Sequence, residues 1–463
     1  MDPRSLNYIA AACGGELLNG SPLKELSGIC TDSRKIQPGQ LFFALAGPKY
    51  NGHDFLPEVI PQAWAVVVER ARAPKSPGKC AVIVVEDTLR ALAKLAARYR
   101  EDFALPIVAV AGSNGKTTTK ELIASVLQEG FRSLWSEASF NNGIGVPLTL
   151  LRLGQTHQAA VLEAGTNHPG ELEPLVRMIQ PAYGVITSIG REHLEFFGDL
   201  AGVAQEEGWL SELLPPNGKL FINGDTEWSL PIAARCPGGV VKVGLAEHNH
   251  WRVTHLRPDK QGISFRVEGP SASLAGEYRI ALLGRHQAVN ALFAICVGGE
   301  LGLERAEIER GLSQCKPAKM RLQLWESNGV RVLDDAYNAN ADSMLAALRT
   351  LQDLPCKGRR LAVLGDMGEL GAQSEAAHEE VGRCAAELGV GQLFAVGKMA
   401  PVMARGARNA GLNRVMEFPD VTSAALAVKQ FVRDGDLLLL KASRATCLEK
   451  VSEQLRGGVA RKN

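Results

Sequence analysis

The residues best suited to chemistry lie in the glycine-rich segment GSNGKTT. Two glycines permit a tight turn whose backbone N–H groups can point at an anion. Lys116 can neutralise that anion, and the hydroxyl of Thr117 can hold Mg²⁺. The segment therefore predicts a site for the phosphates of ATP, and the alternative is an ordinary strand-to-helix turn with a surface lysine. Its members are Gly112, Ser113, Asn114, Gly115, Lys116, Thr117 and Thr118.

Two further polar residues follow strands of the same expected sheet. Glu163 comes after the apolar run 159–162, and a carboxylate beside a phosphate loop is the usual position of a Mg²⁺ ligand. His193 follows the apolar run 184–189. A lone histidine is more often structural than a metal ligand, but ligands bind where the carboxyl ends of parallel strands meet. Thr117 and Glu163 are therefore candidate metal ligands, and His193 gains weight as a third candidate only because it follows a strand of the same sheet.

Polar clusters also follow three strands near the C-terminus. They occupy residues 334–340, 365–370 and 441–444. Loops alone do not need so many polar side chains, so these strand ends are expected to form part of a binding site.

The apolar pattern indicates the elements that position these groups. Residues 107–110 are predicted to form a buried strand, followed by the phosphate loop and a helix. From there strands and helices alternate, which predicts a doubly wound, mostly parallel sheet. The pattern breaks at residues 316–319 and resumes as a Rossmann-like unit, and a smaller α/β unit precedes the central one. We therefore expect an α/β protein of three domains, at residues 1–86, 87–314 and 315–463.

Bulk composition narrows the class of protein. The chain has 463 residues, 46% of them hydrophobic, and a net charge of +1. The charges are dispersed, which argues against a nucleic-acid partner. No apolar run is long enough to span a membrane, and the first residues do not begin a signal peptide. The nine cysteines never form a CxxC pair, as is typical of reduced cytoplasmic proteins.

In this order, the motifs resemble those of the Mur ligases, which build the peptide stem of bacterial peptidoglycan. The phosphate loop and Glu163 are typical of the whole family, although Val110 stands where a standard phosphate loop has another glycine. The segments DDAYNANADSM (334–344) and LGDMGELG (364–371) are similar to those of members that add D-alanyl-D-alanine to UDP-N-acetylmuramoyl-tripeptide. The resemblance implies a cytoplasmic, ATP- and Mg²⁺-dependent ligase of these two substrates, and we expect a monomer.

The resemblance also implies roles for individual residues. Lys116, Glu163, His193 and Glu207 would act in catalysis, with the phosphate loop holding ATP. Mg²⁺ would be bound by Thr117, Glu163 and His193. Further contacts to ATP would come from Asn290, Arg321 and Asp335. The N-terminal domain would hold the UDP group through Ser33, Arg34, His53, Asp54 and Phe55. The residues near the incoming dipeptide would be Asn338, Asn340 and Ser343.

Two positions depart from the family pattern. Gln287 follows His286 where the family usually has asparagine. Glu207 stands where members usually have a lysine that carries CO₂ as a carbamate and helps to bind Mg²⁺. We expect Glu207 to supply that negative charge itself, so that activity needs no bicarbonate. The alternative is a solvated helix face, and Glu206, about 100° away around the helix, is expected to be a bystander.

Two other functions remain open at this stage. A folylpolyglutamate synthase has the same loop and chemistry, but it begins almost directly with the ATP domain. A catalytically silent nucleotide-binding regulator would explain the departures from the family pattern, but it would not need an intact set of Lys116, Thr117, Glu163 and His193.

Overall fold

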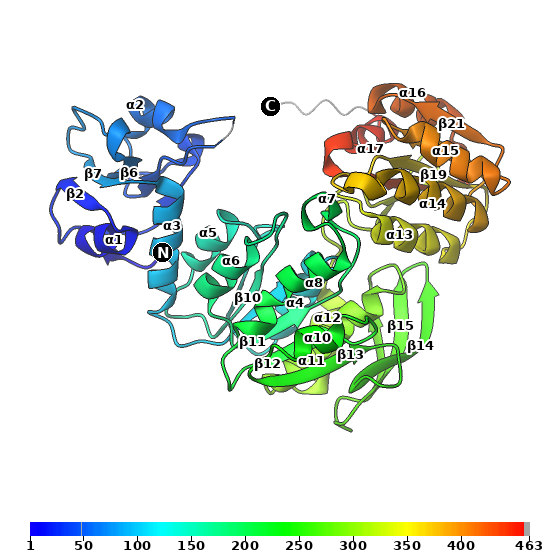
Figure 1. Cartoon of the computed structure of the whole chain (residues 1–463), viewed down its shortest axis with the longest axis horizontal. Helices are drawn as coiled ribbons and strands as arrows, with labels where there is room; N and C mark the ends of the chain where they lie inside the picture. The colour runs from blue at the N-terminus through cyan, green and yellow to red at the C-terminus, as the bar shows by residue number, and fades with distance from the viewer. Residues whose placement is uncertain (48, 458–463) are drawn as a thin grey trace.

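The computed structural model describes residues 1–47 and 49–457. Three α/β bodies follow one another along the chain, with the N-terminal one at the left of Figure 1 and the C-terminal one at the right. Each has its own sheet, of five, nine and six strands in chain order. The predicted three-domain α/β architecture is confirmed.

The N-terminal sheet has the strand order β2-β7-β6-β5-β4, with β2 antiparallel to β7 and the other pairs parallel. Its strands are β2 (Glu16–Asn19), β4 (Ile29–Cys30), β5 (Leu41–Phe43), β6 (Ala65–Glu69) and β7 (Ala81–Val85), beside helices α1 (Leu6–Cys13) and α2 (Leu56–Val59). A separate antiparallel pair joins β1 (Arg4–Ser5) to β3 (Glu25–Leu26).

Helix α3 (Thr88–Arg100) connects the first two bodies. The Asp87 side chain accepts the Arg90 N–H and so caps its start. Its apolar face belongs to one core cluster that contains residues of both neighbouring sheets. Helix α3 therefore packs against both of these bodies. The domain boundaries expected after residues 86 and 314 stay predictions.

The central sheet has the order β16-β15-β14-β13-β12-β11-β8-β10-β9. Strands β8 to β14 pair with one another in parallel, whereas β14-β15 and β15-β16 are antiparallel. The strands are β8 (Ile107–Ala111), β9 (Ser133–Trp135), β10 (Ala159–Glu163), β11 (Tyr183–Ile186), β12 (Lys219–Asn223), β13 (Gly239–Gly244), β14 (Trp251–Asp259), β15 (Gly262–Glu268) and β16 (Gly276–Ile280).

Helices cover both faces of this sheet because alternate residues of its buried strands point to opposite sides. Helices α4 (Lys116–Leu127), α11 (Gln287–Glu300) and α12 (Arg305–Gln314) share the core that contains Val108 and Val110. Helices α5 (Gly145–Leu150) and α6 (Leu172–Ile179) share the core of Ile107 and Ala109 with α3. The remaining helices are α7 (Leu194–Phe197), α8 (Leu200–Glu207), α9 (Trp209–Glu212) and α10 (Ser229–Ala233).

The C-terminal sheet has the order β17-β18-β22-β19-β20-β21, parallel except for β17. Its strands are β17 (Gln323–Ser327), β18 (Val330–Asp334), β19 (Arg360–Gly365), β20 (Gln392–Val396), β21 (Val415–Phe418) and β22 (Leu437–Lys441). Its helices are α13 (Ala341–Asp353), α14 (Ser374–Glu387), α15 (Ala400–Asn409), α16 (Val421–Phe431) and α17 (Glu449–Leu455).

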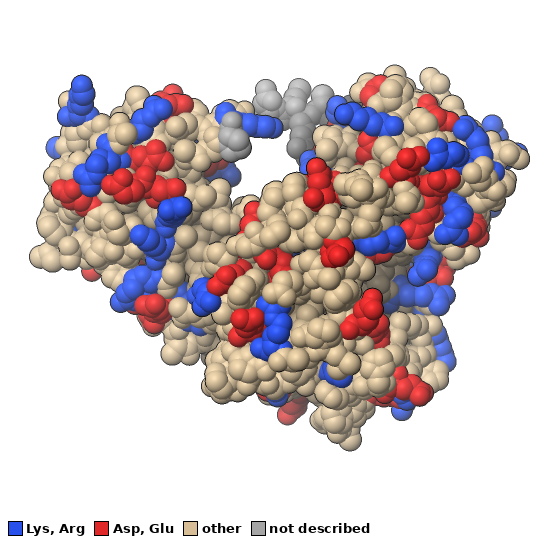
Figure 2. Space-filling view, in the orientation of Figure 1, with Lys and Arg blue, Asp and Glu red and all other residues tan. Residues whose placement is uncertain are grey.

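The surface of the molecule carries charges of both signs, interspersed over the face shown in Figure 2. Within the described part of the chain, no helix combines the length and the apolar character that a bilayer span requires.

Candidate active site

A cavity of about 1240 Å³ lies between the central and C-terminal bodies, and its far end reaches Leu89 and Arg90 on α3. Most of the residues that the sequence singled out line it. They are Ser113, Asn114, Gly115, Lys116, Thr117, Thr118, Glu163, His193, Asn290, Arg321, Asp335, Asn338, Asn340 and Ser343. Neither Gly112 nor Glu207 is among the lining residues, and the five N-terminal residues lie elsewhere.

The phosphate loop owes its shape to its two glycines. Gly112 and Gly115 have φ angles of +109° and +86°, in the region that L side chains rarely adopt. A Cβ atom at Gly112 would lie 2.6 Å from the Thr187 hydroxyl, and one at Gly115 would lie 2.7 Å from Asn290 Oδ1. Gly115 also caps α4, so the first N–H groups of that helix face the cavity.

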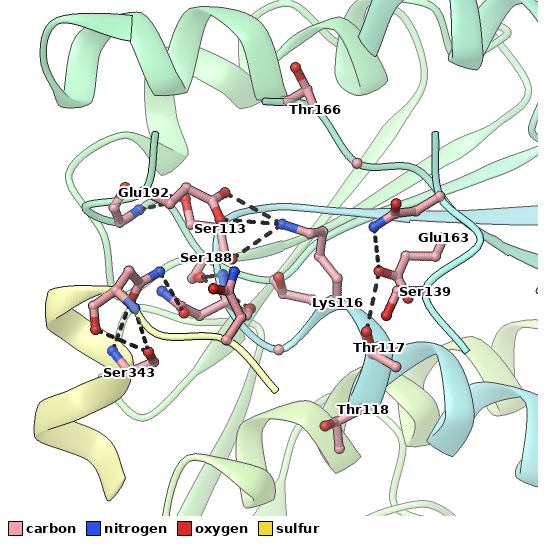
Figure 3. A pocket seen from close by; sticks show the side chains of 18 of the residues that line it. Ser113, Lys116, Thr117, Thr118, Ser139, Glu163, Thr166, Ser188, Glu192 and Ser343 are labelled. Atoms are coloured by element: carbon pink, nitrogen blue, oxygen red, sulfur yellow. Dashed lines mark hydrogen bonds and ion pairs between the residues drawn. The ribbon is translucent and has the colours of Figure 1, made fainter. Parts of the chain in front are cut away.

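Lys116 lies in the middle of this cavity (Figure 3). Its ammonium donates to the carbonyl oxygens of Gly112 at 2.5 Å and Ser113 at 3.2 Å, and lies 3.4 Å from Glu192 Oε1. Its side chain is only 14% exposed. Burial lowers the pKa of Lys116, but the carboxylates around it, first of all Glu192, outweigh burial and raise it. The lysine is therefore held as a cation.

Glu192 is the principal partner that the sequence left without a role. Its carboxylate is buried, and burial raises its pKa. It is adjacent to His193 in the segment that follows β11. This position after a strand is the sequence feature that could have identified Glu192 as a site residue.

Glu163 has the contacts expected of a metal ligand. Its Oε1 accepts hydrogen bonds from the Thr117 hydroxyl at 3.2 Å and from Asn141 Nδ2 at 2.8 Å (Figure 3). Its Oε2 is buried and has no hydrogen-bond partner. The described residues contain no group of three metal-binding side chains. Mg²⁺ usually takes only one or two carboxylates besides phosphates and water, so the residues present fit it.

His193 contacts the C-terminal body rather than a group of metal-binding residues. Its Nδ1 is hydrogen-bonded to the Glu369 carboxylate, and its Nε2 lies 3.9 Å from Glu192 Oε2. Burial lowers the pKa of its imidazole. The residue has a φ of +50° where α7 begins. Because Glu369 occupies Nδ1, only Nε2 is left to face a ligand.

The two glutamates at the end of α8 are both buried, with Glu206 at 5% and Glu207 at 1% exposure. The alternative, in which Glu207 lies on a solvated helix face, is therefore wrong. Glu207 Oε2 accepts the Gly112 N–H at 2.7 Å, while its Oε1 is buried without a partner. Burial raises the pKa of Glu207 to about 7. Glu207 thus fixes the backbone of Gly112, the first residue of the phosphate loop, without lining the cavity.

Glu206 is not the expected bystander. Its carboxylate accepts the backbone N–H groups of Gly170 at 2.9 Å and Leu172 at 2.8 Å. These residues belong to the loop after β10, which lines the cavity, and to the start of α6. The two glutamates therefore point in different directions, as their angle around the helix requires, but each meets a loop of the site.

The C-terminal body contributes the opposite wall of the cavity. Asp335 accepts from the Lys441 ammonium at 2.6 Å and from the Leu322 N–H at 3.2 Å. The Arg321 guanidinium lies over the Tyr337 ring, 4.4 Å from its centroid.

Helix α13 points its capped start at the phosphate loop. Asn340 and Ser343 form a capping box, in which each side chain accepts the backbone N–H of the other. Asn340 Nδ2 also donates to Asn114 Oδ1 at 3.0 Å, so the two walls touch at this point.

The residues expected near adenine form a small amide network. Asn290 Nδ2 donates to Gln287 Oε1 at 2.8 Å. The longer glutamine therefore reaches along its own helix to Asn290. His286 also lines the cavity, and burial lowers its pKa to about 4, so its ring is neutral at neutral pH.

The residues expected to bind UDP stay within the N-terminal body. Arg34 is 85% exposed and forms a two-pronged contact with Asp32, at 2.8 and 2.9 Å. His53 is buried, with Nδ1 hydrogen-bonded to Asn51 and Nε2 accepting the Glu69 N–H at 2.9 Å. The His53 ring therefore fixes its loop to β6, whereas the Arg34 side chain, although paired with Asp32, is exposed to solvent.

Three family models match successive parts of the chain. The model described as Mur ligase family, catalytic domain, matches residues 25–100. Mur ligase middle domain matches residues 110–298, and Mur ligase, glutamate ligase domain, matches residues 320–444.

Full-length relatives agree with these matches. The chain is 35% identical to the UDP-N-acetylmuramoyl-tripeptide–D-alanyl-D-alanine ligase of Bacillus subtilis (strain 168), over 98% of the chain and 99% of the relative. It is 34% identical to the ligase of the same name from Escherichia coli (strain K12), over 98% of both. The crystal structure of MurF from Acinetobacter baumannii has a TM-score of 0.89 and 30% identity, over 98% of this chain and 99% of that one. The chain therefore belongs to the Mur ligase family.

Proposed function

We propose that this chain joins D-alanyl-D-alanine to the tripeptide carboxylate of UDP-N-acetylmuramoyl-tripeptide, converting ATP to ADP and phosphate. The observation that carries the proposal is the cavity in which Lys116 and Thr117 of the phosphate loop face Asn338 and Asn340 of the C-terminal body. A nucleotide phosphate and an incoming amine can meet there. Relatives aligned over nearly the whole chain are ligases of this name, which supports the proposal.

The chemistry requires activation of a carboxylate, because a carboxylate and an amine do not condense at neutral pH. The tripeptide carboxylate attacks the γ-phosphorus of ATP, and the bond to ADP breaks. The amine of the dipeptide then attacks the acyl carbon, and phosphate leaves with the electrons of the C–O bond. Lys116 opposes the charge that accumulates on the phosphoryl oxygens, and the start of α4 directs its N–H groups at the same place.

Mg²⁺ would be held by the Thr117 hydroxyl and the unpartnered oxygen of Glu163, with Nε2 of His193 available nearby. When bound, it supplies positive charge to the phosphates. The site needs this additional positive charge because three carboxylates surround one ammonium group. They belong to Glu163, Glu192 and Glu207, and the ammonium belongs to Lys116. Glu207 is a carboxylate without CO₂, so we propose that activity is independent of bicarbonate.

The N-terminal body would hold the UDP part of the precursor, with Arg34 as the exposed cation for its phosphates. On the opposite wall, Asn290, Arg321 and Asp335 would contact ATP, and Asn338, Asn340 and Ser343 would contact the dipeptide. A folate substrate would leave that first body without a ligand, and a silent regulator would not need Lys116 fixed among carboxylates. Both alternatives are therefore less well supported.

Omission of single substrates tests this function. Phosphate release should require ATP, UDP-N-acetylmuramoyl-tripeptide and D-alanyl-D-alanine together, and mass spectrometry should find the tripeptide nucleotide extended by two alanines. A folate with glutamate serves as the competing substrate pair. Phosphate release that needs the folate pair, or no phosphate release with any pair, would contradict the proposal.

A further inference from the structure

The segment 190–193, between β11 and α7, contacts the phosphate loop and the C-terminal body in alternation. Gly190 N–H donates to the Ser113 hydroxyl at 2.8 Å, and Glu192 lies 3.4 Å from the Lys116 ammonium. The residues between and after them turn the other way, toward the C-terminal body. One short segment therefore joins the two walls of the cavity, and Figure 3 shows Glu192 and Ser113 beside Lys116.

Arg191 makes several hydrogen bonds with the C-terminal body. Its backbone N–H donates to Asp342 Oδ2 at 2.8 Å, and its Nε donates to Asp342 Oδ1 at 2.9 Å. Its Nη1 donates to Glu380 Oε2 at 2.6 Å. The three side chains are between 27% and 37% exposed, so water screens this network only in part.

Because of the position of Asp342, this network fixes the start of α13. Asp342 lies in the first turn of α13, directly beside the Asn340–Ser343 capping box. Glu380 lies on α14, so Arg191 contacts two helices of the C-terminal body. A guanidinium that binds carboxylates with several N–H groups fixes orientation as well as distance. Contacts of this kind matter most between domains, which otherwise move relative to one another.

We propose that Arg191 is a positioning residue, which holds the start of α13 against the phosphate loop through Asp342 and Glu380. This proposal rests on the proposed function. By holding α13 in this position, Arg191 places the dipeptide amine within reach of the acyl phosphate and keeps water from taking the place of the amine. Arg191 itself is not among the residues that line the cavity.

The acyl phosphate has two possible fates, and they can be counted separately. If the amine attacks the acyl carbon, the C–O bond breaks, phosphate leaves, and the amine loses a proton to form the amide. If water attacks instead, phosphate leaves and the carboxylate returns, so ATP is spent without ligation. The ratio of phosphate released to dipeptide incorporated measures how well the amine is positioned.

The test compares this ratio in the full-length enzyme and in Arg191→Ala. We expect a ratio near one in the parent and a ratio raised roughly tenfold in the variant, the factor for losing a charge-assisted hydrogen bond. The KM for D-alanyl-D-alanine should rise more than the KM for ATP. Asp342→Asn should raise the ratio in the same direction, and Arg191→Lys should restore it in part.

Arg285→Ala is the matched control. Arg285 also bridges the central and C-terminal bodies, through a two-pronged contact with Asp353 at 2.8 and 2.9 Å, but α13 ends there. This control should leave the ratio near one. An unchanged ratio in Arg191→Ala, or an equal rise in Arg285→Ala, would overturn the proposal. If the parent makes no extended nucleotide at all, the proposed function fails instead, and small-angle scattering of Arg191→Ala still shows whether the bodies separate.

Discussion

Replacing Lys116 by alanine separates the chemistry of the site from its stability. The substitution removes the cation that faces the phosphates but leaves the two glycines and α4 in place. Loss of one principal electrostatic stabiliser costs about a thousandfold in turnover, or about 4 kcal/mol of transition-state stabilisation. We therefore expect ligation to fall by about that factor, with little change in the KM for the UDP-tripeptide.

The same substitution affects the folded state through Glu192. The Lys116 side chain is only 14% exposed, and it pairs with the Glu192 carboxylate, which is 10% exposed. Without the lysine, burial forces Glu192 to take up a proton. The variant therefore loses the stability contributed by one charged hydrogen bond, and it does not bear the larger cost of a buried, unpaired charge. We expect the free energy of unfolding to fall by about 1–3 kcal/mol.

A double variant distinguishes the two effects. Lys116→Ala with Glu192→Gln leaves no carboxyl group to neutralise, so urea denaturation should show much of the stability restored while ligation stays low. Steady-state phosphate release and the urea midpoint would be measured on the parent, both single variants and the double variant. Turnover by Lys116→Ala above about a tenth of the parent rate would refute the phosphate-loop assignment.

Three further variants test other parts of the account. Arg34→Ala should raise the KM for the UDP-tripeptide far more than that for ATP, and a change confined to ATP would contradict the role given to the N-terminal body. Glu206→Ala leaves two backbone N–H groups without an acceptor, so urea denaturation should show a loss of about 2–5 kcal/mol. Burial raises the pKa of Glu207 to about 7, so the folded protein keeps a proton that the unfolded chain releases above about pH 4.5. Stability should therefore fall as pH rises across that window, and Glu207→Gln, which cannot titrate, should show a flatter profile of urea midpoint against pH.

The parts of the site carried by continuous motifs were predictable from sequence. The glycines of the phosphate loop, Lys116 and the strand-end Glu163 follow from local backbone geometry and from the rule that parallel strands end at one edge. The three-domain α/β fold follows similarly from the alternation of strands and helices.

Contacts between distant segments were not predictable. Glu206 is 36 positions from Gly170, and nothing in its own helix indicates which loop it meets. Arg191 meets Asp342 only because two separately folded bodies dock, and its neighbours in sequence have no pattern that distinguishes it from a surface arginine. Such residues depend on tertiary packing, which a single sequence does not encode locally.

The most direct test of the central claim is the fate of a labelled carboxylate oxygen. UDP-N-acetylmuramoyl-tripeptide with ¹⁸O in its terminal carboxylate would be incubated with the enzyme, ATP and D-alanyl-D-alanine, and the phosphate analysed by mass spectrometry. If the carboxylate attacks ATP and phosphate then leaves with the bridging oxygen, each phosphate released should carry one labelled atom. Unlabelled phosphate accompanying formation of the extended nucleotide would contradict the account.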